Sequence, residues 1–90
     1  MDAAQTSDIP GLAFLRYVLD ALVDDKGALS IEGRIDELGV LLTVSVGETD
    51  MGKLIGKGGQ TVKALRTLLR IIGGNAQQRI NMKILEPAGS

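Results

Sequence analysis

Residues 55–62 read Ile-Gly-Lys-Gly-Gly-Gln-Thr-Val, and this stretch is the most informative part of the chain. Three glycines and one lysine stand between two segments with helical periodicity. Backbone N–H groups in a glycine-rich turn can approach a phosphate oxygen, which a Cβ atom would obstruct. The stretch therefore predicts a turn that contacts phosphate. The flanking sequence has to distinguish a mononucleotide, a dinucleotide and a nucleic-acid strand.

The glycine spacing excludes two nucleotide-binding patterns. A P-loop requires Gly-x4-Gly-Lys followed by Ser or Thr and comes after a strand. Here Gly52 to Gly58 read Gly-x3-Gly-Lys-Gly, and a helical segment precedes the turn. The dinucleotide pattern Gly-x-Gly-x-x-Gly also fails, because the sequence from Gly56 is Gly-Lys-Gly-Gly-Gln-Thr. What remains is a Gly-x-x-Gly turn from Gly56 to Gly59, between two helices.

Helical spacing of apolar residues predicts three helices, at residues 11–24, 49–54 and 60–72. We expect Gly27 to cap the C-terminus of the first helix. Thr49 or Asp50 is expected to cap the N-terminus of the second. The third should stop at Gly73-Gly74.

Alternation of apolar and polar residues predicts three strands, at residues 29–35, 40–46 and 79–85. A turn at residues 36–39 joins the first two as an antiparallel hairpin. The expected inward-facing residues are Leu29, Ile31, Gly33 and Ile35, then Val40, Leu42, Val44 and Val46, then Ile80, Met82 and Ile84. The element order is α-β-β-α-α-β, an α+β fold.

Length and composition predict one domain and exclude several classes of protein. Ninety residues suffice for a single core, which we place at residues 10–85, with a flexible lead-in at 1–9 and a tail at 86–90. There is no run of 18 apolar residues and no secretory signal, so no membrane span is expected. Cysteine and histidine are absent, which fits a reducing cytoplasm and disfavours a metal site or a catalytic nucleophile–base pair. We expect a cytoplasmic, non-enzymatic chain without a cofactor or a small-molecule substrate.

The net charge of −1 conceals a division of charge between the two halves of the chain. Residues 1–50 hold three basic and ten acidic residues, a net charge of −7. Residues 51–90 hold seven basic residues and one acidic residue, a net charge of +6. One surface can therefore attract phosphate although the whole chain is slightly acidic. A solvated basic helix face balanced by an acidic one would give the same numbers.

With these features the sequence resembles a KH domain, whose Gly-x-x-Gly loop clamps about four nucleotides of a single-stranded backbone. The resemblance rests on Met51 to Leu65, Met-Gly-Lys-Leu-Ile-Gly-Lys-Gly-Gly-Gln-Thr-Val-Lys-Ala-Leu. The element order is similar to the bacterial type II arrangement, which implies a three-stranded mixed sheet covered on one face by three helices. The Met51 to Lys57 approach and Arg66-Thr67-Leu68 are similar to the small bacterial RNA-binding proteins of the KhpA family, over residues 10–85.

The resemblance implies a set of RNA-binding residues around the turn. Lys57 is the foremost phosphate contact, Lys63 and Arg66 follow on one helix face, and Lys53 is secondary. Arg70 is as readily a surface residue as a contact. The full expected set is Lys53, Ile55, Gly56, Lys57, Gly58, Gly59, Gln60, Lys63 and Arg66.

Two features of the expected site affect the strength of binding. The KhpA family commonly has a basic residue directly after the second glycine, where this chain has Gln60. Ile55, Val62 and Ile80 are candidates for an apolar floor beneath the bases, although each is equally suited to the core. The only aromatic residues, Phe14 and Tyr17, are in the first helix. Because base stacking on aromatic rings is missing, we expect weak, salt-sensitive binding with little sequence preference.

The implied function is that of a single-stranded RNA-binding protein. By resemblance it would act as an RNA chaperone or post-transcriptional regulator, paired with itself or with a second KH-domain protein. In that family the pairing influences cell elongation and division. The alternative is a protein-interaction module, in which the fold serves dimerisation and RNA contact is vestigial.

Overall fold

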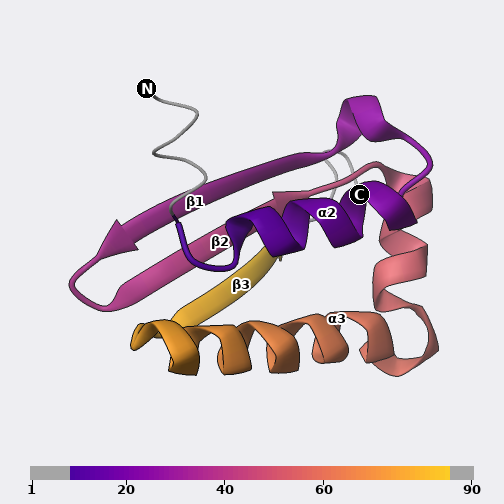
Figure 1. Cartoon of the computed structure of the whole chain (residues 1–90). Helices are drawn as coiled ribbons and strands as arrows, with labels where there is room; N and C mark the ends of the chain where they lie inside the picture. The colour runs from indigo at the N-terminus through magenta and orange to yellow at the C-terminus, as the bar shows by residue number, and fades with distance from the viewer. Residues whose placement is uncertain (1–8, 86–90) are drawn as a thin grey trace.

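The computed structural model describes residues 9–85, except for the side chain of Lys57. The elements in chain order are α2 (Leu12–Leu22), the short 3-10 helix η1 (Lys26–Ala28), β1 (Ser30–Asp36), β2 (Gly39–Ser45), α3 (Glu48–Ala76) and β3 (Ile80–Leu85) (Figure 1). The predicted lead-in and tail fall largely at residues 1–8 and 86–90, outside the described part. Ile9 was expected in the lead-in, yet it packs against the core and over Gly33.

The three strands form one mixed sheet in the order β1-β2-β3. β1 and β2 pair antiparallel from Ser30↔Ser45 to Asp36↔Gly39, which confirms the predicted hairpin. β3 pairs parallel to β2, from Val40↔Ile80 to Ser45↔Leu85. β2 is therefore the central strand, and β1 and β3 are the two edges.

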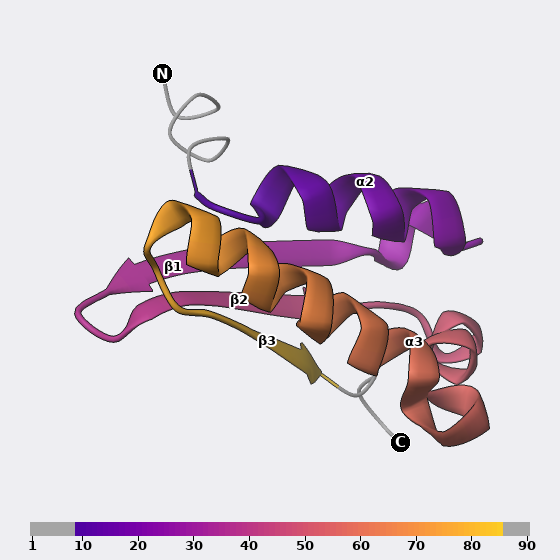
Figure 2. The ribbon, with the colours of Figure 1, turned by 60° about the horizontal axis from the view of Figure 1, so that its bottom comes forward.

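The helices cover a single face of this sheet (Figure 2). The inward residues of β2 and their neighbours on α2 and α3 are fully buried, since alternate residues of a strand point to the same face. One expected core residue is exposed: Ile35 is 51% exposed, because it lies near the hairpin end of the edge strand β1. The core consists of Leu12, Leu15, Leu19, Val23, Ile31, Val40, Leu42, Val44, Val46, Met51, Leu54, Val62, Leu65, Leu69, Ile80 and Met82.

A glycine at the start of β2 fixes how β3 joins the sheet. Gly39 has φ +126°, a conformation that side chains rarely adopt, and a Cβ atom there would overlap the Arg79 carbonyl oxygen. That oxygen accepts the Val40 N–H at 2.7 Å. The close approach of the two backbones therefore depends on the missing side chain.

The end of α3 differs from its prediction. The helix continues through Gly73 and Gly74 to Ala76, so the predicted stop is wrong. Gln77, with φ +59°, ends it, and the Gln78 N–H donates to the Gly73 carbonyl at 2.8 Å. A Cβ at Gly73 would overlap the Gln78 carbonyl oxygen. Gly73 therefore permits the tight connection into β3 and does not terminate the helix.

Candidate nucleic-acid interface

The glycine turn lies inside α3 and divides it into two segments. Gly58 and Gly59 have φ +75° and +73°, outside the right-handed helical region. The helix axis changes direction in this part of α3 (Figure 1). Counting the two segments separately gives the predicted order α-β-β-α-α-β. The first segment begins at Glu48 with Gly47 at the N-cap position, so the prediction that Thr49 or Asp50 caps it is wrong.

The glycines of the turn face open space. Apart from the adjoining backbone, a Cβ atom at Gly56, Gly58 or Gly59 would meet none of the described atoms within 4 Å. The positive φ of Gly58 and Gly59 explains why these two are glycine. Gly56 has no positive φ, and a glycine in a helix costs about 0.5–1 kcal/mol relative to alanine. Within the described residues neither backbone conformation nor packing requires glycine at position 56, which makes Gly56 a candidate for close approach by a ligand.

A groove beside the turn joins α3 to the end of β3. Its lining consists of Ile55, Gly59, Val62, Lys63, Arg66 and Ile84. Ile55 is 45% exposed, Val62 is buried, and Ile84 is half-buried, so part of the floor is apolar and open.

Ile84 takes the place in the groove that the sequence suggested for Ile80. Ile80 is buried at the other end of β3 and lines different hollows, so of its two expected places the structure gives it the core and not the groove floor. The reason is topological: β3 follows a tight connection and runs back along α3 (Figure 2). Its last residues therefore return to the turn. Alternation alone puts Ile80 and Ile84 on the same face and cannot choose between them.

Two cations project at the groove, and neither is neutralised within the described residues. Lys63 and Arg66 are exposed, and the ion pairs within residues 9–85 involve neither. Arg66 Nη2 donates to the Met82 carbonyl oxygen at 3.5 Å, which directs the guanidinium along β3. Gln60 is exposed directly after the turn. The arrangement combines an open glycine backbone, an apolar floor and positive charge.

Comparison with known proteins identifies the family. The family description "KhpA/KhpB, KH domain" matches residues 13–84, which include both segments of α3 and the whole sheet. The chain belongs to the KhpA/KhpB family of KH domains. The expectation of a non-enzymatic chain agrees with this family, whose similar members are named as RNA-binding proteins.

Three relatives show how far the likeness to KhpA extends. The RNA-binding protein KhpA of Chlamydia pneumoniae is 36% identical over 73 residues, covering 81% of this chain and 94% of the relative. KhpA of Aquifex aeolicus is 37% identical over 65 residues, 72% of this chain and 82% of the relative. KhpA of Streptomyces coelicolor is 37% identical over 60 residues, 67% of this chain and 76% of the relative.

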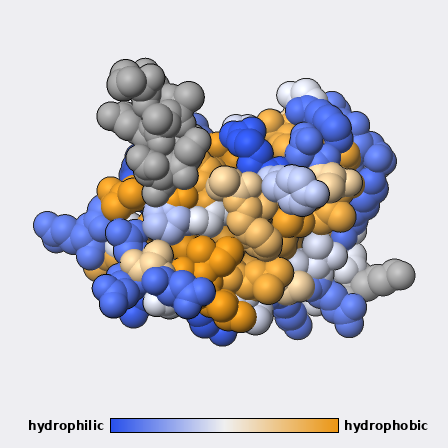
Figure 3. Space-filling model, in the orientation of Figure 1, coloured by the Kyte–Doolittle hydropathy of each residue, from blue (hydrophilic) through white to orange (hydrophobic). Residues whose placement is uncertain are grey.

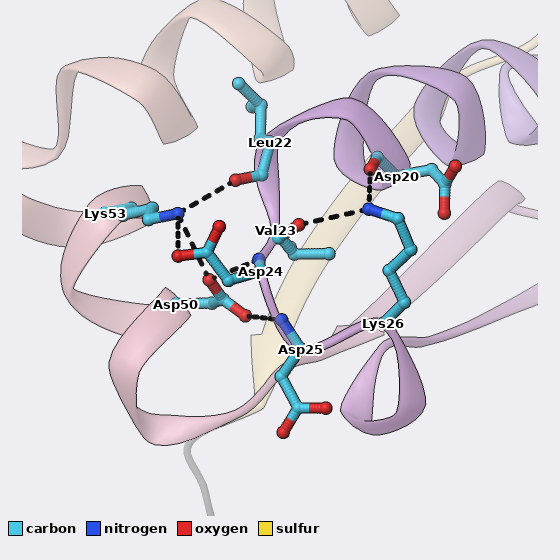
Figure 4. A network of polar contacts seen from close by, with 8 residues as sticks. All are labelled: Asp20, Leu22, Val23, Asp24, Asp25, Lys26, Asp50 and Lys53. Carbon is cyan, nitrogen blue, oxygen red and sulfur yellow. Dashed lines mark hydrogen bonds and ion pairs between the residues drawn. The ribbon is translucent and has the colours of Figure 1, made fainter.

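Lys53 lies outside the groove of this KH domain. Its Nζ is 2.7 Å from Asp24 Oδ2 and 3.5 Å from Asp50 Oδ1, and it donates to the Leu22 carbonyl at 3.2 Å (Figure 4). The hydrogen bond to Asp24 raises the pKa of Lys53 above its ordinary 10.5. The ammonium therefore joins α3 to the end of α2, and Lys53 is not among the residues that line the groove.

Asp50 is the residue of this region that sequence reasoning missed. Its side chain is 1% exposed and accepts the backbone N–H groups of Asp24, at 2.9 Å, and Asp25, at 3.0 Å. These two hydrogen bonds, followed by the charge of Lys53, lower the pKa of Asp50 below its ordinary 3.8. The partners are 25 and 26 residues away, so only the fold reveals them.

The same region corrects the predicted end of the first helix. α2 ends at Leu22, and Val23 is already extended, so Gly27 does not cap it. Lys26 Nζ donates to the carbonyl oxygens of Asp20, at 2.7 Å, and Val23, at 3.3 Å (Figure 4). A lysine ammonium therefore satisfies carbonyl groups at this helix end.

A different hollow lies at the opposite edge of the sheet, beside β1. It is lined by Ile9, Ile31, Glu32, Gly33, Arg34, Leu41 and Thr43. It has neither a glycine turn nor a helix terminus, and a carboxylate accompanies its one cation. We therefore place the candidate interface at the α3–β3 groove. Within residues 9–85, no group of three or more acidic side chains could hold a metal ion, and no helix is long and apolar enough to cross a membrane.

Proposed function

We propose that this KhpA/KhpB domain binds single-stranded RNA at the α3–β3 groove, in the cytoplasm. The observation that carries the proposal is the open turn of Gly56 to Gly59, beside a groove with two cations, Lys63 and Arg66, that form no ion pair within residues 9–85. The relatives' name, RNA-binding protein KhpA, supports the same ligand.

The RNA backbone would lie across the turn. Gly56, Gly58 and Gly59 leave room for phosphate oxygens to meet backbone N–H groups. The second segment of α3 begins there, and its N-terminal end adds a partial positive charge. Lys57 is in the turn by sequence and completes the proposed phosphate contacts.

Side chains of the groove would hold the adjoining nucleotides. Lys63 and Arg66 supply Coulombic attraction to phosphate, and Gln60 supplies a hydrogen bond without charge. Ile55 and Ile84 offer apolar surface to the bases. No aromatic side chain lines the groove, so base stacking on rings contributes nothing here. We expect modest affinity, a steep salt dependence and little sequence preference.

The direct experiment compares wild type with the Lys57→Asp/Gly58→Asp variant. Binding of a short fluorescent single-stranded RNA is measured by anisotropy at low salt. We expect binding to be lost in the variant, because two carboxylates would repel the phosphates at the turn. Equal affinity of the two proteins would overturn the proposal.

A matched control separates the turn from overall charge. Ala13→Asp/Arg16→Asp makes the same change in net charge at two exposed positions of α2. It should retain RNA binding. Thermal unfolding of each variant shows whether the fold is intact, since Gly58 has a positive φ and aspartate there is strained.

The cellular role we propose is that of an RNA chaperone or post-transcriptional regulator. A domain that contacts the RNA backbone with little base preference can act on many transcripts. It requires no catalytic group. An effect on cell elongation and division belongs to the same proposal and is tested by deleting the chain in its host.

A second proposal is that the domain pairs with another copy of itself or with a second KH-domain protein. Hydrophobic side chains gather on the face that carries α2 and α3 (Figure 3). Leu68 and Ile71 are 44% and 57% exposed on α3, and Tyr17 is exposed on α2. Exposed apolar area of this kind favours association. The alternative to RNA binding is that the domain serves only as a dimerisation scaffold and its RNA contact is vestigial.

A further inference from the structure

Two further hollows lie next to the α3–β3 groove, beyond the residues of the proposed four-nucleotide clamp. A second hollow begins at Arg66, which it shares with the groove, and includes Leu69, Arg70, Ile80, Asn81 and Met82. A third shares Arg70, Ile80 and Asn81 with the second and adds Gly74, Gln78 and Arg79. The three hollows therefore follow one another along the edge strand β3, and we call this row of hollows the channel. Arg66, whose Nη2 donates to the Met82 carbonyl oxygen at 3.5 Å, is the residue that the first two hollows share.

The side chains of this extension are suited to phosphate. Arg70 is four residues after Arg66, so both are on the flank of α3 that faces β3. Arg79 stands at the other end, where the chain enters β3. Both arginines are exposed, and the ion pairs among residues 9–85 all involve Lys53 instead. Gln78 and Asn81 add uncharged hydrogen-bonding groups.

The backbone at the far end of the channel is held in place independently of the arginine side chains. The Arg79 carbonyl oxygen accepts the Val40 N–H at 2.7 Å, and the Gln78 N–H donates to Gly73. Truncating either arginine leaves these bonds intact. The channel from Gly59 to Gly74 covers 15 residues of α3, or about 22 Å at the rise of an α-helix.

We propose that Arg70 and Arg79 form a second phosphate-binding segment, so that the domain takes a single strand longer than the about four nucleotides of the clamp. The inference rests on the proposed function and specifies its ligand: an extended RNA whose backbone continues past Arg66 toward Gln78. The extension contains no apolar base platform comparable to Ile55 and Ile84. It therefore contributes affinity and salt dependence but no sequence preference.

The experiment measures binding of oligouridine four and eight nucleotides long to wild type and to Arg70→Ala/Arg79→Ala. Uridine strands avoid competing RNA structure. We expect the variant to bind the four-nucleotide strand as wild type does and to lose about tenfold affinity for the eight-nucleotide strand at low salt. The salt dependence of the longer strand should become shallower by about 1.4 in log K against log salt, because each phosphate contact contributes about 0.7.

The control variant is Arg16→Ala/Arg34→Ala, which removes the same charge from exposed positions on α2 and β1. It should retain wild-type affinity for both strands. A longer strand offers more positions at which the protein can bind, which raises the apparent affinity. This statistical gain is the same for all three proteins, so it does not affect the comparison of their affinities. If Arg70→Ala/Arg79→Ala binds the eight-nucleotide strand as tightly as wild type, or loses no more affinity for it than the control variant, the proposed extension is overturned. If wild type binds neither strand, the proposed function itself fails.

Discussion

At the scale of single residues, Gly56 is a position where the fold does not require glycine but the proposed RNA ligand does. It lies in α3 without a positive φ, and a Cβ there would contact none of the described residues beyond its own helix turn. Gly58 and Gly59 next to it are fixed by their own backbone conformation. Gly56 is therefore the position where stability and binding should respond in opposite directions.

We predict that Gly56→Ala stabilises the domain by about 0.5–1 kcal/mol, because alanine loses less backbone entropy in a helix. The same methyl group should weaken RNA binding by about tenfold, because it stands where a phosphate approaches. Urea unfolding and RNA anisotropy measure the two effects on one protein preparation.

Gly74→Ala is the control for this prediction. Gly74 is also a helical glycine with open space around it, but it lies about 22 Å along α3 from the turn. It should stabilise the fold similarly and leave the binding of a four-nucleotide strand unchanged. Unaltered RNA affinity in Gly56→Ala would show that no ligand approaches this glycine.

At the scale of elements, the carboxylate of Asp50 connects the start of α3 to the chain that leaves α2. It accepts two backbone N–H groups from that segment, and Lys53 binds both Asp50 and Asp24. The first segment of α3, which leads to the glycine turn, is thereby fixed relative to α2. Lys53 has a structural part here, where the sequence suggested an RNA contact.

We predict that Asp50→Asn lowers the stability of the fold at neutral pH. The pKa of Asp50 is lowered in the folded state, so the stabilisation is complete above the ordinary value of 3.8. It disappears as the pH falls through the lower pKa of the folded protein. The difference in unfolding free energy between wild type and Asp50→Asn should therefore narrow as the pH falls well below 3.8.

Glu37→Gln provides the comparison for this pH profile. Glu37 is exposed in the hairpin turn, so its removal changes the net charge equally without touching the Asp50 contacts. The unfolding free energy of Glu37→Gln should change with pH in the same way as that of wild type. If the unfolding free energies of Asp50→Asn and wild type differ by the same amount at every pH, the role assigned to the Asp50 carboxylate is contradicted.

At the scale of the whole molecule, the two sides of α3 have different characters. The flank toward β3 carries Lys63, Arg66 and Arg70, whereas Leu68 and Ile71 lie exposed elsewhere on the helix. One helix can therefore serve an RNA groove and a protein contact at the same time. The two proposals are compatible because they use different residues.

We predict that Leu68→Gln/Ile71→Gln shifts the protein toward the monomer in sedimentation velocity. Both side chains are already exposed, so the melting temperature of the monomer should change little. RNA binding through the groove should persist. Tight self-association of wild type with no salt-dependent RNA binding would instead favour the scaffold function.

Ile35→Gln/Leu38→Gln tests whether any exposed apolar pair has this effect. These residues lie at the end of β1 and in the hairpin turn, on different elements from α3. This variant should associate as wild type does. A monomeric wild type at high concentration would contradict the pairing proposal outright.

The sequence by itself determined the strands, the hairpin and the fold class. Alternation along residues 40–46 predicted the strand that became β2, and the glycine spacing excluded two nucleotide-binding patterns. These features are local, because periodicity and backbone conformation depend on neighbouring residues. The resemblance to the KhpA family followed from residues 51–68, which contain the Gly56 to Gly59 turn and its flanking helical segments.

Only the tertiary structure decided which side chains meet. In the structure Ile84 lines the groove and Ile80 does not. Lys53 forms ion pairs with Asp24 and Asp50. The tertiary structure also extended α3 past Gly73, where the close approach of the Gln78 backbone needs a glycine inside the helix. Such contacts join residues far apart in the chain. These long-range contacts cannot be predicted from local sequence patterns, because they depend on how β3 returns along α3 and where α2 ends.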